Sequence, residues 1–296
     1  MIILGCSASN GIDISLARIL GADLSKIETT TFPDGETKVK VPEIRDADGK
    51  VVIVQSTFYP QEKALFELLL ASYELKDQKI KNVTAVVPYL AYARQNRSFS
   101  TGEAVSISVV LDMLRAAGVS SLITVNPHKS GPLMGFKGKV CVANVVDTLA
   151  TYVKGQIKEP LVLAPDEGGL DLAKRAASKL KCDYAYIEKN RDSYGMVSIK
   201  KTHGGDFKGK DVVIFDDIIS TGSTIAQAAR FAYGEGASSV SAAGVHLIMA
   251  SSAFENMHNA GVVKVYGTNT IPCEKADVVD ISTDIAECID DIYSNE

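Results

Sequence analysis

The segment DVVIFDDIISTGST, Asp211–Thr224, decides how this chain is expected to fold. Its four apolar residues, Val212–Phe215, predict a buried strand that ends in two carboxylates, Asp216 and Asp217. Hydroxyl and glycine residues follow, and then a helical pattern. Backbone N–H groups and hydroxyls at a helix N-terminus favour an anion. Any one of these residues alone is more typical of a solvated strand end or an ordinary helix cap.

Short runs rich in Val and Ile recur along the whole chain and alternate with amphipathic segments. Buried strands that alternate with helices are typical of parallel sheets, so the predicted fold class is α/β. The expected strands are Ile2–Leu4, Val51–Val54, Val83–Val87, Leu122–Val125, Leu161–Ala164, Tyr184–Ile187, Val212–Phe215, Val240–Val245 and Val262–Tyr266. The clearest helical patterns are Gln61–Leu75, Ala104–Ala117, Leu170–Leu180 and Thr224–Tyr233.

A weak internal repeat divides the chain in two. VVIVQSTFYP, from Val51, and DVVIFDDIIS, from Asp211, both begin a strand, turn, helix and strand, although any two βαβ units look alike at this level. The 296 residues suffice for about two domains, and the predicted domains are 1–145 and 146–296. Because the first copy has Gln55-Ser56-Thr57 where the second has two aspartates, we expect it to have lost a ligand site. Whether Ile281–Tyr293 folds back onto the first domain stays open.

The whole string of strand, acidic pair, hydroxyl-rich loop and helix is more specific than its parts. It resembles the phosphoribosyl-binding loop of type I phosphoribosyltransferases and of the ribose-phosphate pyrophosphokinase (phosphoribosyl pyrophosphate synthetase) family. The resemblance implies two tandem phosphoribosyltransferase-like domains, in which the acidic pair contacts ribose hydroxyls and the loop binds the 5-phosphate. The implied ribose 5-phosphate ligands are Asp216, Asp217, Ser220, Thr221, Gly222, Ser223 and Thr224.

Two further blocks of the second half resemble the synthetases. Ala164–Gly169 is similar to their PDxGG pyrophosphate loop, which implies that Asp166 holds magnesium, although alone it is a glycine-rich turn. Glu188–Asp192 lies where the family has a mobile catalytic loop. Lys189 and Arg191 match its catalytic residues, and Arg191 is also implied to contact ribose 5-phosphate. Asn190 departs from the basic residue common in bacterial members, and from charge alone the segment is a hairpin loop.

The first half separates the synthetases from the transferases. Thr31–Glu36 resembles their FxDGE segment, which contacts ATP, although Pro-Asp-Gly alone predicts a tight turn. Pro88–Arg97 resembles their PYxxYxRQDR block, whose Arg-Gln pair reaches the nucleotide. His128 matches a histidine associated with magnesium and the ATP phosphates. The Asn-Pro before it departs from the bacterial Asp-Leu, and imidazole is not the preferred ligand of magnesium.

The site residues that this resemblance implies fall into two sets. Those expected to bind ATP are Phe32, Asp34, Gly35, Glu36, Arg94, Gln95, Arg97 and His128. Those expected to bind the metal are His128 and Asp166.

The implied reaction transfers the β,γ-pyrophosphoryl group of ATP to the anomeric hydroxyl of ribose 5-phosphate, with Mg²⁺, and releases AMP. The resemblance also implies a homo-oligomer, either a dimer or a hexamer. One alternative is a phosphoribosyltransferase, which has no need of a second α/β half. The other is a non-catalytic relative, a synthetase-associated regulatory subunit or a transcription regulator. The regulatory subunit is disfavoured because the charged residues Lys189, Arg191, Asp166 and Asp216 are intact. The transcription regulator is disfavoured because the chain has no basic helix-turn-helix extension.

The composition excludes other classes. With 31 Lys plus Arg against 36 Asp plus Glu, the net charge of −5 argues against a nucleic-acid binder with a general basic field. Apolar stretches fall short of the ~20 residues of a membrane span, and the start, MIILGCSASNG, lacks the basic region of a signal peptide. We therefore expect a cytoplasmic protein with no membrane partner. The five cysteines form no CxxC pair and are expected to be buried free thiols.

Overall fold

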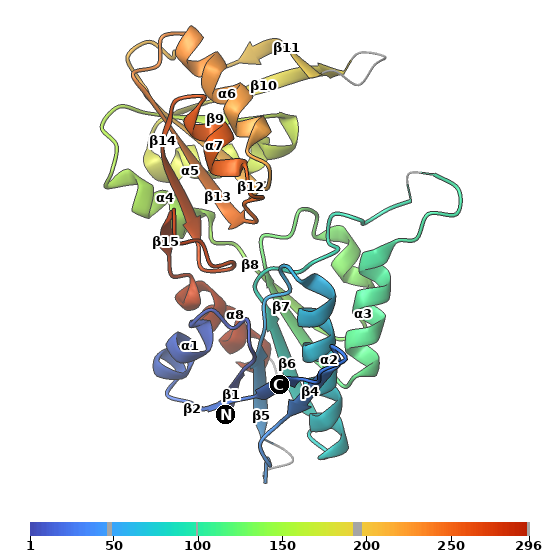
Figure 1. The fold of residues 1–296 in the computed structure, drawn as a ribbon. Helices are drawn as coiled ribbons and strands as arrows, with labels where there is room; N and C mark the ends of the chain where they lie inside the picture. The colour runs from blue at the N-terminus through green and yellow to red at the C-terminus, as the bar shows by residue number, and fades with distance from the viewer. Residues whose placement is uncertain (46–48, 99, 192–196, 295–296) are drawn as a thin grey trace. The chain divides into compact units, whose positions relative to one another are not determined.

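The chain forms two α/β units in a computed structural model (Figure 1). The structure describes residues 1–45, 49–98, 100–191 and 197–294, and for 189–191 and 197–201 it describes only the backbone. Unit 1 comprises Met1–Asn144 and Asp280–Glu296, and unit 2 comprises Val145–Val279. Among the described helices, none is long and apolar enough to cross a membrane.

Unit 1 is built on a six-stranded parallel sheet with the order β2-β1-β5-β6-β7-β8. These strands are β1 (Ile2–Gly5), β2 (Asp23–Lys26), β5 (Lys50–Val54), β6 (Asn82–Val87), β7 (Ser121–Val125) and β8 (Lys139–Ala143). A separate antiparallel hairpin joins β3 (Glu28–Thr31) to β4 (Thr37–Lys40). The helices are α1 (Ile12–Leu20), α2 (Gln61–Asp77), α3 (Ser106–Ala116), the 3-10 turn η1 (Gly131–Gly135) and α8 (Ser282–Ser294). Helices α2 and α3 cover one face of the sheet, and α1 and α8 cover the other (Figure 1).

Unit 2 has a seven-stranded sheet with the order β11-β10-β9-β12-β13-β14-β15, parallel except for the β10–β11 hairpin. Its strands are β9 (Pro160–Ala164), β10 (Asp183–Arg191), β11 (Val197–His203), β12 (Asp211–Ile219), β13 (Ser239–Leu247), β14 (Val262–Thr268) and β15 (Asp277–Val279). Its helices are α4 (Val146–Lys154), the 3-10 turn η2 (Glu167–Gly169), α5 (Leu170–Leu180), α6 (Ser223–Gly234) and α7 (Ala253–His258). One apolar core lies on the α6 side of the sheet and a second on the α4–α5 side.

The two sheets repeat one strand order, which confirms the predicted internal repeat. The run β2-β1-β5-β6-β7-β8 corresponds to β10-β9-β12-β13-β14-β15, so β1 matches β9 and β5 matches β12. All nine predicted strands are present. The sequence missed β2, β3, β4, β8, β11 and β15, because these strands are short, charged or rich in threonine, or lie at an edge of the sheet or in the separate hairpin, and carry little apolar periodicity.

The C-terminal helix α8 belongs to unit 1, whereas the predicted division assigned residues 146–296 to the second domain. Ile285 and Ile289 are fully buried, and the Tyr293 hydroxyl lies 2.9 Å from Oγ1 of Thr84 on β6. The Ser15 hydroxyl of α1 also donates to Asp280 at 2.9 Å. An apolar helix face shows that a helix is covered but not by which sheet, so periodicity alone left this arrangement open.

A disulfide between Cys141 of β8 and Cys288 of α8 ties this helix to the sheet. The expectation of five free thiols was therefore wrong for this pair, although Cys6, Cys182 and Cys273 are free. The two bonded residues are 147 positions apart, with Cα atoms 5.8 Å apart. They come together only because α8 returns to unit 1, which their spacing in the sequence does not indicate.

Replacing Cys288 should destabilise unit 1. We expect Cys288→Ser to lower the free energy of unfolding by about 2–5 kcal/mol, since the crosslink closes a long loop and anchors α8. Thermal unfolding of the unreduced protein measures the change, and Cys273→Ser, a free half-buried thiol, is the matched control. Equal melting temperatures for the two variants, or five titratable thiols in the unreduced parent, would contradict the crosslink.

Candidate active site

In unit 2 the predicted acidic pair lies where strand β12 extends beyond the end of its neighbour β9. The pairing of β12 with β9 ends at Ile214 and Leu163, whereas its pairing with β13 continues to Ile219 and Leu247. Strand β12 therefore extends through Asp216 and Asp217, beyond the predicted end at Phe215. Both side chains are partly exposed beyond the end of β9, at the edge where parallel α/β sheets bind ligands.

The hydroxyl-rich loop that follows β12 leads directly into α6. Gly222 has φ of 72° and precedes the first residue of α6, and a Cβ here would approach the Ala253 carbonyl oxygen to 2.7 Å. Only glycine meets both requirements. Thr221 and Ser223 are exposed, with their hydroxyls 3.1 Å apart. The first N–H groups of a 12-residue helix and these hydroxyls form an anion site of the predicted kind.

The segment around α7 donates hydrogen bonds to the backbone carbonyls of this loop and so fixes its position. The N–H groups of Met249 and Ala250 donate to the carbonyls of Ile219 and Ser220 at 3.1 and 2.9 Å. The Asn256 side-chain amide donates to the Thr221 carbonyl at 2.9 Å. Sequence reasoning did not single out Asn256, since a lone asparagine on a six-residue helix belongs to no motif.

Three carboxylates gather beside the loop. Burial raises the pKa of Asp216 well above its ordinary value, and the neighbouring charges of Asp217 and Asp166 raise it further. Asp166 follows β9, and its side chain accepts a hydrogen bond from the Gly168 N–H at 3.0 Å. Carboxylates this close repel one another, so they favour sugar hydroxyls or a cation between them.

Magnesium prefers oxygen ligands, and Asp166 and Asp216 supply them. Within the described residues, however, no three His, Cys, Asp or Glu side chains are grouped closely enough to hold a metal by themselves. A magnesium ion at this edge would therefore take its remaining ligands from substrate and water. His128, the other predicted metal residue, is an exposed residue of unit 1.

Lys189 and Arg191 lie on the backbone of β10, and their side chains fall outside the described residues. Strand β10 continues past its predicted end at Ile187 because it pairs with β11, with a register shift between Glu188 and Lys189. Asp192, the last residue of the predicted loop, is likewise not described. In the described part of the same hairpin, the His203 ring stacks on Tyr186 with centroids 4.6 Å apart. The Nε2 atom of His203 lies 3.1 Å from Oε2 of Glu188.

In unit 1, Phe32–Glu36 forms the turn of the β3–β4 hairpin. The Phe32 N–H donates to the Glu36 carbonyl at 2.8 Å, and the Glu36 N–H donates to Oδ1 of Asp34 at 3.1 Å. Gly35 has φ of 96°, as a tight turn requires. Phe32 is 49% exposed, so an aromatic ring is presented to solvent at this turn.

The second predicted ATP block follows β6. Arg94 and Arg97 are exposed, whereas Gln95 turns inward, and its side-chain amide donates to Oε1 of Glu103 at 2.7 Å. Gln95 thus braces the loop, an internal role that the motif did not predict. His128 follows β7, the strand next to β6.

The first turn of α2 holds the two ATP blocks together. Lys63 Nζ donates to the Thr31 hydroxyl of the hairpin at 3.0 Å, and the Tyr92 hydroxyl donates to Oε1 of Glu62 at 2.7 Å. Segments 31–36 and 88–97 therefore meet at one helix start. The structure thus brings the predicted ATP residues to one edge of unit 1 and the ribose 5-phosphate residues to one edge of unit 2.

Comparisons with known proteins match the two halves of the chain to two different domain models. Residues 1–118 match the model of the N-terminal domain of ribose phosphate pyrophosphokinase, and residues 140–273 match the phosphoribosyl transferase domain. A ribose-phosphate pyrophosphokinase of Saccharolobus solfataricus is 48% identical over 97% of this chain and 99% of its own length. The chain belongs to the ribose-phosphate pyrophosphokinase family.

Other relatives support this assignment over the full length. The ribose-phosphate pyrophosphokinase of Sulfolobus acidocaldarius is 43% identical over 98% of this chain and 100% of its own length. The fold superposes on the crystal structure of phosphoribosylpyrophosphate synthetase from Mycobacterium smegmatis with a TM-score of 0.87. That similarity covers 100% of this chain and 99% of the other at 27% identity. The family therefore accounts for both units and for the predicted fold class.

The cluster of Asp166, Asp216 and Asp217 should lower the free energy of unfolding of the ligand-free enzyme. We expect Asp216→Asn to raise the free energy of unfolding by about 0.5–2 kcal/mol and to abolish ribose 5-phosphate binding. Because the pKa of Asp216 is raised in the folded state, ionising this group costs stability as pH rises, so the gain should be larger at pH 8 than at pH 5. Thermal unfolding at both pH values measures it, with exposed Asp183→Asn as control. A melting temperature lower than that of the parent at pH 8 would contradict the prediction.

Proposed function

We propose that this protein is a ribose-phosphate pyrophosphokinase that makes phosphoribosyl pyrophosphate and AMP from ATP and ribose 5-phosphate. The observation that carries the proposal is the carboxylate pair of Asp216 and Asp217 beside an exposed hydroxyl loop at a helix start. The family membership gives the reaction, and the retained ATP blocks of unit 1 favour it over a phosphoribosyltransferase.

Unit 2 is the proposed ribose 5-phosphate domain. The 5-phosphate is bound by the N–H groups and hydroxyls of residues 220–224, where the partial positive charge of α6 favours an anion. The acidic pair accepts hydrogen bonds from the two ring hydroxyls, so the sugar replaces the repulsion between the carboxylates with favourable contacts. Arg191, on β10, is proposed as a further ribose 5-phosphate ligand.

Unit 1 is the proposed ATP domain, with Phe32 and Asp34–Glu36 in the hairpin turn and Arg94, Gln95, Arg97 and His128 after β6 and β7. Exposed guanidinium groups suit phosphate oxygens, because the planar fork binds them in pairs and keeps its charge. The exposed ring of Phe32 offers a surface on which a base can stack.

The reaction requires Mg²⁺ in this family, and Asp166 with Asp216 would hold it at the edge of unit 2. In unit 1, His128 is the other residue proposed to bind a metal ion. When bound, the ion neutralises negative charge on the phosphate oxygens. The protein's own contribution is then to keep Asp166 oriented, which the Gly168 N–H does.

The chemistry is the attack of the anomeric oxygen of ribose 5-phosphate on the β-phosphorus of ATP. The bond between the β-phosphorus and the α,β-bridging oxygen breaks, AMP leaves with that oxygen, and the hydroxyl proton is lost. Such a transfer needs alignment and compensation of spreading negative charge. Lys189 and Arg191 are the proposed catalytic cations.

A homo-oligomer, either a dimer or a hexamer, belongs to the same proposal. An exposed apolar groove of about 360 Å³ lies between α2 and α3, with Phe66, Leu69, Val109 and Met113 in its wall. Phe66 is 53% and Val109 54% exposed, so this groove leaves apolar side chains in contact with water. Burial against a second chain would remove it.

Phosphorus NMR of the products tests the function directly. The protein with ATP, magnesium and ribose 5-phosphate should give AMP and phosphoribosyl pyrophosphate together, and each addition should be required. Formation of ADP would instead mean that a single phosphoryl group is transferred and would contradict the proposal, as would the absence of turnover.

The same assay separates the catalytic lysine from a binding one. Lys189→Ala should lower kcat by about 10²-fold or more while the Kd for ribose 5-phosphate changes little, because the charge is needed in the transition state. The exposed Lys179→Ala of α5 is the control and should be unaffected. An effect of Lys189→Ala confined to KM would assign Lys189 to substrate binding.

A further inference from the structure

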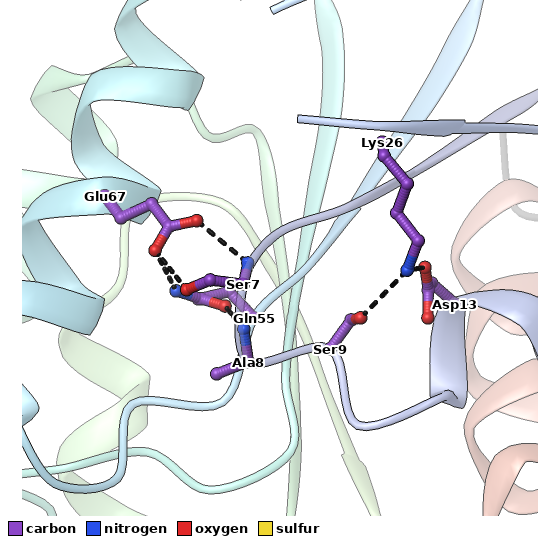
Figure 2. Close-up of polar contacts among 7 residues, drawn as sticks. All are labelled: Ser7, Ala8, Ser9, Asp13, Lys26, Gln55 and Glu67. Carbon is purple, nitrogen blue, oxygen red and sulfur yellow. Dashed lines mark hydrogen bonds and ion pairs between the residues drawn. The ribbon is translucent and has the colours of Figure 1, made fainter. Parts of the chain in front are cut away.

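Glu67, on α2, is a buried carboxylate that no catalytic motif includes. It is 1% exposed and accepts four hydrogen bonds from three segments of unit 1. The N–H and hydroxyl of Ser7 donate at 2.9 and 2.5 Å, the Thr29 hydroxyl at 2.8 Å and the Gln55 side-chain amide at 3.1 Å. Figure 2 shows the carboxylate of Glu67 pointing towards Ser7 and Gln55.

The repeat gives these partners counterparts in unit 2. Ser7 lies two residues beyond the end of β1, as Asp166 lies two residues beyond the end of β9. In the paired strands, Gly5 faces Val54, and Leu163 faces Ile214. With Ser7 matched to Asp166, Gly5 matches Ala164, and continuing the β9–β12 register by one residue places Ala164 opposite Phe215. Val54 therefore matches Phe215, and Gln55 matches Asp216.

The two edges therefore have opposite chemistry. In unit 2 the counterparts, Asp166 and Asp216, are carboxylates, so their partners must be hydroxyl groups of a substrate or a cation. In unit 1 they are a hydroxyl and an amide, which donate to a carboxylate that the chain itself supplies. The ligand site that the first copy was predicted to have lost is thus filled from within by Glu67.

The loop after β1 makes further hydrogen bonds besides those that Ser7 donates to Glu67. The side-chain Oε1 of Gln55 accepts a hydrogen bond from the Ala8 N–H at 2.8 Å, and the Ser9 hydroxyl lies 3.4 Å from Lys26 Nζ. Lys26 in turn pairs with the buried Asp13 of α1 (Figure 2). Glu67 consequently receives its hydrogen bonds from a fixed loop, and its own position is well defined.

Thr29 links this cluster to the ATP domain's hairpin. It lies on β3, two residues before Thr31, and the turn between β3 and β4 carries Phe32–Glu36. A two-stranded hairpin is marginal by itself and needs contacts to the rest of the unit. The contact of Thr31 with Lys63 is exposed, whereas that of Thr29 reaches a buried charged acceptor, which makes a stronger and better-aimed hydrogen bond.

We propose that Glu67 is a positioning residue for ATP binding: it occupies in unit 1 the place that substrate takes in unit 2 and fixes the ATP-contacting hairpin through Thr29. This inference rests on the proposed function, because it takes Phe32–Glu36 to contact ATP. It assigns to Glu67 no contact with either substrate.

Thr29→Val tests the link without disturbing the rest of the cluster, since it removes one hydroxyl from a part-exposed strand. We expect KM for ATP to rise about tenfold, the typical effect of losing a hydrogen bond to a charged group. The KM for ribose 5-phosphate should be nearly unchanged, and Thr29→Ser should restore KM for ATP. Thr30→Val, at an exposed position on the same strand, is the matched control.

The outcomes separate the two proposals. A parent enzyme that forms no phosphoribosyl pyrophosphate sinks the proposed function before the variants are compared. With an active parent, an unchanged KM for ATP in Thr29→Val overturns the positioning role. Equal losses for both substrates, or a loss that Thr29→Ser does not repair, overturn it as well, because a general structural defect would explain them.

Discussion

The unequal length of three parallel strands is the constraint on which the substrate edge of unit 2 depends. Strand β12 pairs with β13 as far as Leu247 but leaves β9 at Leu163. Its last residues therefore carry Asp216 and Asp217 past the end of β9, and the chain then reaches Gly222 at the start of α6. The acidic pair and the phosphate loop follow from this one offset. Burial in this position raises the pKa of Asp216, and the nearby carboxylates of Asp217 and Asp166 raise it further.

The two units put one architecture to opposite uses. Their sheets share a strand order, but the edge of unit 2 keeps carboxylates that await hydroxyls or a cation, whereas unit 1 closes the matching edge with Glu67. A closed edge is a rigid support, and in the proposed function unit 1 uses it to hold the loops assigned to ATP. The proposal makes the first copy a scaffold for one substrate and the second copy the binding site of the other.

The sequence predicted those features that are local. Alternating apolar runs identified the nine strands, and the order of residues in DDIISTGST identified the loop. Interactions between distant positions were not predictable. Nothing near Cys288 indicates Cys141, 147 residues away, and Glu67 is one acid among many on a helix until Ser7 and Gln55 are known to face it. Gln95, which its motif assigns to ATP, also donates to Glu103, a contact that the motif does not predict.

The measurement that tests this account most directly is a crystal structure of the protein with ribose 5-phosphate. The account predicts a phosphate on the N–H groups of residues 221–224, ring hydroxyls on Asp216 and Asp217, and no ligand at the loop after β1, where Glu67 keeps Ser7 and Gln55. A phosphate bound at Ser7 with Glu67 displaced, or a sugar bound away from the acidic pair, would contradict it.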